Sequence, residues 1–148
     1  MKYRDGYDGQ LCETVHYQLP YELHPENEIY TEFIRLDCLG ELTIRAGYCW
    51  DYASVPLTHW ISNKVAGRKS KVPSLVHDAL CQLHRNKYLP HDQDRAHTDR
   101  FFYQLLLERK FWRVRAWLWF KAVRVGAKYS KQQPKKVYTA PWKSYSQF

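Results

Sequence analysis

One histidine and two aspartates have types and spacing suited to proton transfer. Asp99 lies in a helical run where its neighbours at i+3 and i+4 are Phe102 and Tyr103, so it falls on an apolar stripe. A carboxylate there is costly unless something pairs with it. A candidate partner, His77, stands earlier in the chain beside Asp78. If the two helices pack antiparallel, Asp99 could orient His77 as a general base, which leaves Asp78 to bind a hard cation such as calcium.

The same residues allow two other interpretations. His77 and Asp99 could form a purely structural pair that ties two helices together. A zinc site could use His77, Cys81 and His84, with Asp99 or His97 as the fourth ligand. The residue types suit zinc, but their spacing matches no recognised zinc pattern.

Asp51 is a further acid of interest, because it stands between two aromatic residues, Trp50 and Tyr52, in a loop. Such a carboxylate could face a site, or it could cap a short helix expected after Pro56. Ser54 follows in the same loop without the glycines of a nucleophile elbow. The loop therefore does not predict a serine hydrolase of that type.

The elements that must position these residues change character along the chain. Residues 1–57 hold short alternating apolar runs and predict a small antiparallel β-sheet or hairpins, with residues 48–56 as a loop. From residue 72 the apolar spacing becomes helical and predicts three helices, at 72–85, 93–109 and 112–126. The expected fold class is α+β, with a single domain over 1–127 and an extended basic tail over 128–148.

Particular residues predict the ends and faces of these helices. Asp92 or Asp94 suits the N-cap of the second helix, and Gly126 suits the C-terminal end of the third. One face of the third helix contains four apolar residues, Val114, Trp117, Leu118 and Val125.

The net charge of +8 is unevenly distributed. Residues 1–108 carry 12 Lys+Arg against 15 Asp+Glu, whereas residues 109–148 carry 11 Lys+Arg and no acid. A basic segment on a mildly acidic body indicates an anionic partner (lipid headgroups, nucleic acid or an acidic protein face) or else a solubilising surface. The candidate anion-binding residues are Arg113, Arg115, Arg124, Lys128, Lys131, Lys135 and Lys136.

Cysteine usage and hydropathy limit the classes of protein further. None of the four cysteines forms a CxxC pair, so they are expected to be buried free thiols. No apolar run is long enough for a membrane span, and the first residues show no signal-peptide core. The expected location is therefore a cytoplasm.

Four motifs in order resemble a phage-borne family known as domain of unknown function 1353. The matching residues are Gly47, Tyr48, Asp51 and Ala53 to Pro56, then His77, Asp78 and Leu80, then Thr98, Asp99 and Phe102, then Ala122 to Arg124 and Gly126. Cys81 stands where the family pattern has an aromatic residue. The resemblance implies a bacteriophage or prophage origin, and so a location in the host cytoplasm during infection or in the virion. It implies no established function.

The residues at the proposed pair also resemble those of secreted and parvoviral calcium-dependent phospholipases. The resemblance implies that His77 activates water, that Asp78 binds calcium and that Asp99 orients the histidine. The glycine-rich calcium loop of those enzymes is missing before His77, so the loop around Asp51 would have to supply the oxygen ligands.

Three functions follow as expectations. The first is a virion-associated or assembly protein, in the phage tail for example, that docks on other phage structural proteins. The second is a small phospholipase-like or envelope ester hydrolase that uses His77 and Asp99 with a metal near Asp78. The third is a nucleic-acid-binding protein that uses the basic C-terminal segment, although no named nucleic-acid-binding motif is present.

Overall fold

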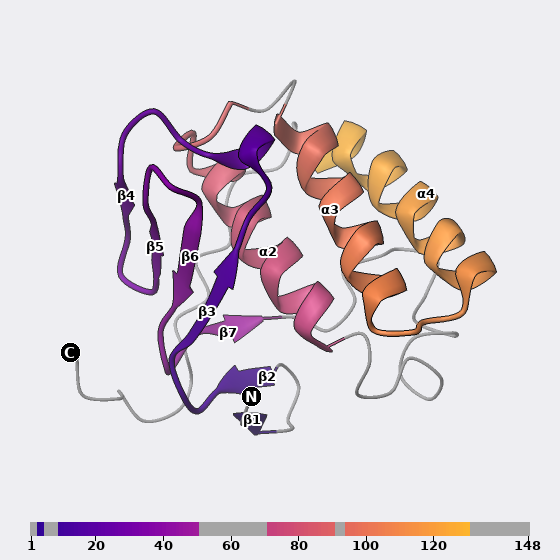
Figure 1. Ribbon diagram of the computed structural model, residues 1–148, viewed down its shortest axis with the longest axis horizontal. Helices are drawn as coiled ribbons and strands as arrows, with labels where there is room; N and C mark the ends of the chain where they lie inside the picture. The colour runs from indigo at the N-terminus through magenta and orange to yellow at the C-terminus, as the bar shows by residue number, and fades with distance from the viewer. Residues whose placement is uncertain (1–2, 5–8, 51–70, 91–93, 131–148) are drawn as a thin grey trace. The chain divides into compact units, whose positions relative to one another are not determined.

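The computed structural model describes residues 3–4, 9–50, 71–90 and 94–130 (Figure 1). The chain divides into two compact units, whose described parts are a β unit that ends at Trp50 and a helical unit that begins at Lys71. The predicted α+β class is confirmed, because antiparallel strands in two small sheets precede three helices. The short helix expected after Pro56 and the basic tail from residue 131 lie outside the described residues. The single domain over 1–127 stays a prediction.

The smaller sheet of the β unit has three strands in the order β1-β2-β7. These strands are β1 (Tyr3–Arg4), β2 (Gly9–Leu11) and β7 (Cys49–Trp50). In β7, Trp50 pairs with Gly9 and Cys49 pairs with Gln10. The expectation of a loop at 48–56 is therefore wrong for Cys49 and Trp50, because these two residues pair with β2. The sequence pattern did not reveal this partner strand near the N-terminus.

The larger sheet has the order β3-β6-β5-β4, and all its pairings are antiparallel. Its strands are β3 (Val15–Gln18), β4 (Ile29–Tyr30), β5 (Ile34–Leu36) and β6 (Glu41–Ile44), and the 3-10 helix η1 (Tyr21–Leu23) follows β3. The β5–β6 turn needs Gly40, whose φ of 82° is left-handed and whose missing Cβ would lie 2.2 Å from His24 Nε2.

The helical unit consists of α2 (Lys71–Arg85), α3 (Asp94–Glu108) and α4 (Arg113–Ser130). Figure 1 shows that consecutive helices run in opposite directions, and α3 packs against both of the others. This arrangement matters for the site because it places the side chains of α3 between those of α2 and α4.

Helices α2 and α3 end in the same way, each with a lysine in the left-handed region. After α2, the Lys87 N–H donates to the His84 carbonyl and the Tyr88 N–H donates to the Leu83 carbonyl, both at 3.0 Å. After α3, Lys110 occupies the equivalent position, with a φ of 55°. This is the hydrogen-bond pattern of a Schellman motif, which usually places glycine at that position.

The face of α4 that packs against α3 is not the apolar face identified in the sequence. The core shared by α3 and α4 contains Phe102, Leu106, Phe111, Ala116, Trp119 and Val123. The four residues that the sequence places on one face, Val114, Trp117, Leu118 and Val125, are 53%, 49%, 52% and 57% exposed. Because α4 carries apolar residues on opposite sides, spacing alone could not decide which side packs. The predicted end is wrong, because α4 continues past Gly126 to Ser130.

Other predicted features differ in detail. Asp94 is the first residue of α3 rather than its cap, and Asp92 lies outside the described residues. All four cysteines are free, but only Cys81 is buried, and Cys38 is exposed. Within the described segments, no helix has the length and apolar character needed to cross a membrane.

Candidate functional site

The helical unit brings His77 and Asp99 together. His77 lies on α2, and its Nε2 atom is 2.7 Å from Asp99 Oδ1. The imidazole also packs against Phe102, with ring centroids 4.7 Å apart. Because a carboxylate can only accept, Nε2 carries a hydrogen and donates it. The antiparallel packing of α2 and α3 thus produces the contact between His77 and Asp99 that was predicted from the sequence.

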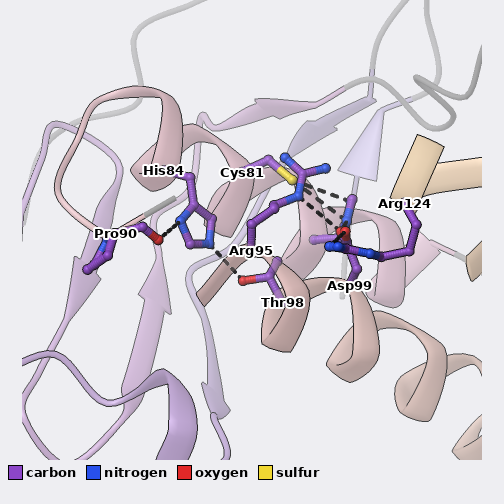
Figure 2. Close-up of polar contacts among 8 residues, drawn as sticks. Cys81, His84, Pro90, Arg95, Thr98, Asp99 and Arg124 are labelled. Atoms are coloured by element: carbon purple, nitrogen blue, oxygen red, sulfur yellow. Dashed lines mark hydrogen bonds and ion pairs between the residues drawn. The ribbon is translucent and has the colours of Figure 1, made fainter. Parts of the chain in front are cut away.

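Asp99 is fully buried, and both of its carboxylate oxygens are occupied. Oδ1 accepts hydrogen bonds from His77 and from Arg95 Nε, the latter at 3.0 Å. Oδ2 accepts a hydrogen bond from Arg124 Nη1, also at 3.0 Å. Figure 2 shows Arg95 and Arg124 converging on Asp99. One carboxylate from α3 therefore joins cationic or ionisable partners from all three helices.

Sequence reasoning found His77 but missed both arginines as partners of Asp99. Arg95 precedes Asp99 by one helical turn, which is the spacing of an i,i+4 ion pair, so this contact was readable from the sequence. Arg124 was predicted to bind an external anion, and its Nη1 atom is engaged with Asp99. Nothing within the sequence pattern placed the Arg124 position of α4 beside α3.

The neighbours of the pair determine its charge state. Burial lowers the pKa of His77, but the nearby Cys81 and the hydrogen bond to Asp99 outweigh burial and raise that pKa to about 9. For the acidic Asp99, burial has the opposite effect and raises the pKa. The hydrogen bond and charge of His77 and the charge of Arg95 outweigh burial and bring the pKa of Asp99 below its usual value. At neutral pH the pair is therefore an imidazolium and a carboxylate.

Cys81 is the third member of this group, one turn after His77 on the same helix. Its Sγ atom lies 3.6 Å from Nδ1 and 3.7 Å from Nε2 of His77. The thiol side chain is buried. Cys81, His77 and Asp99 thus form a continuous series of contacts.

His84 belongs to a second polar contact rather than to the group around Asp99. Its Nδ1 is 3.0 Å from the Pro90 carbonyl, and its Nε2 is 2.8 Å from the Thr98 hydroxyl (Figure 2). Because a carbonyl can only accept, Nδ1 carries the hydrogen, and in the neutral ring the Thr98 hydroxyl donates to Nε2. Both ring nitrogens are used, so His84 does not join His77 and Cys81 in the zinc site considered from sequence.

Only one of the two predicted metal ligands lies among the described residues. Asp78 lies on α2 with its Oδ1 atom 3.8 Å from Arg85 Nη2, and Asp51 lies outside the described residues. Over the described ranges, no group of three or more His, Cys, Asp or Glu side chains could hold a metal ion.

The predicted anion-binding residues are only partly described. Arg113 is exposed and Arg115 half-buried on α4, and Lys128 lies near the end of that helix. Lys131, Lys135 and Lys136 lie outside the described residues.

The chain belongs to the family described as Protein of unknown function (DUF1353), which it matches over residues 29–123. The matched region includes His77, Asp78, Cys81, Arg95 and Asp99, and it ends one residue before Arg124. No curated protein and no solved structure matches the chain.

Proposed function

We propose that the protein is a bacteriophage-encoded structural or assembly protein, associated with the virion and in particular with its tail. The observation that carries this proposal is the saturation of Asp99. Its carboxylate is fully buried, and its two oxygens accept hydrogen bonds from His77, Arg95 and Arg124. A carboxylate bound in this way holds three helices in one arrangement.

The charge state of His77 favours this role over catalysis. A general base needs a free nitrogen lone pair at the working pH. A pKa of about 9 leaves His77 protonated at neutral pH, and its Nε2 atom already donates to Asp99. The phage assignment itself rests on the family resemblance, with other phage structural proteins as the expected partners.

The direct test is the composition of purified particles. We expect quantitative mass spectrometry to find the protein in particles, or in assembly intermediates, at a constant ratio to the main structural proteins. Phage that carry Asp99→Asn should assemble poorly, because the helical unit loses the buried carboxylate that links its three helices. Absence of the protein from both particles and intermediates would contradict the proposal.

A small hydrolase is the second candidate, favoured by the 2.7 Å contact between His77 and Asp99 and by the thiol of Cys81 beside the imidazole. In this alternative, deprotonated His77 takes a proton from water or from the thiol, and Asp99 orients the ring. Calcium would be held near Asp78 and Asp51.

The two candidates separate in one pair of measurements. Turnover of phospholipid or short-chain ester substrates is followed with and without calcium, beside the melting temperatures of His77→Gln and Asp99→Asn. The assembly role predicts no turnover and a large loss of melting temperature for Asp99→Asn. Calcium-dependent turnover that both variants abolish without unfolding would establish the hydrolase instead.

A further inference from the structure

The outer face of α4 is apolar although nothing described within the helical unit covers it. We define this face as Val114, Trp117, Leu118, Lys121 and Val125, which recur at helical spacing on the side opposite the packed residues Ala116, Trp119 and Val123. Its four apolar members are each about half exposed. A helix that is apolar on two sides is normally buried on both.

The exposed Trp112, just before α4, lies in a basic segment of the chain. Trp112 is 66% exposed, and the guanidinium of Arg115 lies 6.0 Å from the centre of its ring. Within the described helical unit, every charged residue from 109 to 125 is basic, namely Arg109, Lys110, Arg113, Arg115, Lys121 and Arg124. Glu108, which ends α3, is the acid that immediately precedes this segment.

We infer that the outer face of α4 and the Trp112 corner form a binding surface for an anionic phospholipid bilayer. Valine and leucine would enter the headgroup boundary, and tryptophan favours that depth because its ring is apolar and its N–H is polar. The surrounding cations would meet lipid phosphates, each contributing about a fivefold gain in partitioning. This inference is independent of the role proposed for Asp99.

The position of Lys121 favours lipid over a protein partner. Lys121 lies within the outer face, with its ammonium 5.4 Å from the centre of the Trp117 ring. The centre of a protein interface is depleted of charge, because a buried ammonium needs a paired counter-charge. At a bilayer surface, the flexible lysine stem lets the ammonium reach the phosphates while its methylenes stay among apolar groups.

The other occupants fit this surface less well. A second copy of the same face would bring like charges together. Nucleic acid would use the cations but leave Val114, Leu118 and Val125 without suitable contacts, since its backbone is polar. Charge complementarity and the apolar stripe therefore agree on an anionic lipid surface.

Co-sedimentation of the full-length chain with vesicles tests the inference. One set of vesicles is phosphatidylcholine alone, and the other contains one quarter phosphatidylglycerol. We expect binding to the anionic vesicles, much weaker binding to the neutral ones, and loss of binding as salt rises from about 0.1 M to about 1 M. Equal binding to both sets, or none to either, would overturn the inference.

Variants identify the surface that binds. Trp117→Ser and Lys121→Gln should each lower partitioning to anionic vesicles by about fivefold or more, because each removes one apolar or one charged contact. Leu39→Ser and Arg100→Gln are matched controls that remove an exposed apolar or basic side chain elsewhere and should bind as wild type does. Circular dichroism of all four variants is the check that each of them folds.

Three outcomes would assign the surface differently and so overturn the inference. If Trp117→Ser and Lys121→Gln bind vesicles as tightly as wild type, residues beyond α4 carry the lipid affinity. If these variants lose duplex DNA binding or self-association while vesicle binding is absent throughout, the surface serves nucleic acid or a second copy. If they fail only to enter phage particles, again without vesicle binding, its partner is a protein.

Discussion

Asp99→Asn tests whether the buried cluster stabilises the helical unit. The amide has nearly the size of the carboxylate and keeps one acceptor oxygen, so packing changes little. It removes the negative charge, and its NH2 group must face one of the donors that now surround the carboxylate, because Asp99 accepts from His77, Arg95 and Arg124. The expected effect is therefore electrostatic.

The size of the effect follows from the exposure of the partners. The side chains of His77 and Arg95 are 13% and 8% exposed, so the change leaves two largely buried cations without their counter-charge. Removing one partner of a buried ion pair costs about 3–5 kcal/mol. Arg124 adds little, because its half-exposed guanidinium can turn to water. For a chain of this size, the melting temperature should fall by about 10 °C.

The assay is urea and thermal unfolding followed by the far-ultraviolet helical signal at neutral pH. Glu108→Gln is the matched control, because it removes a carboxylate from an exposed position of the same helix and should change stability by no more than about 0.5 kcal/mol. A loss below about 1 kcal/mol for Asp99→Asn would refute the view that the cluster holds the helices together.

Three further predictions concern the same unit. Because the pKa of His77 is raised in the folded chain, protonated His77 contributes fully to the free energy of unfolding below its ordinary pKa of 6.5. That contribution is lost as pH rises through about 9. Stability should fall by about 3 kcal/mol across that window, and His77→Gln should abolish this fall. Lys87→Gly should stabilise the chain by about 0.5–1 kcal/mol because it removes a left-handed lysine, whereas the control Asn86→Gly should destabilise it. A lower midpoint of urea unfolding for Lys87→Gly would contradict this prediction. Thr98→Val should cost about 1–3 kcal/mol in urea unfolding by leaving buried His84 without its hydroxyl partner, and an unchanged midpoint would show that this hydrogen bond is dispensable.

The sequence predicted the centre of the site better than its surroundings. Asp99 was readable because a carboxylate on an apolar stripe demands a partner, and His77 stood on a helix expected to pack beside it. Arg95 was equally readable by helical spacing and was missed. The contact between Arg124 and Asp99 could not be predicted, because it depends on which side of α4 packs inward, and both sides are apolar.

In the fold, too, features with a local sequence signal were predicted, whereas features that depend on distant contacts were missed. The first two helices of the second half were predicted to within one residue at each end because their periodicity is local. Strand β7 was missed because it depends on pairing with β2, which lies far away in the sequence. The left-handed Lys87 and Lys110 were not predicted either, since lysine gives no turn signal and their conformation follows from the hydrogen bonds that close α2 and α3.

The two apolar sides of α4 give that helix two competing ways to fold against α3. Rotated by half a turn, it would bury Trp117 and Leu118 in place of Trp119, but it would also turn Lys121 toward α3, where a buried ammonium needs a counter-charge. That rotation would carry Arg124 to the other side of the helix axis and leave Asp99 with one cation fewer. The ion pair between Arg124 and Asp99 and the charge of Lys121 therefore both favour the orientation that the structure shows, in which Trp119 is buried and Trp117 is half exposed.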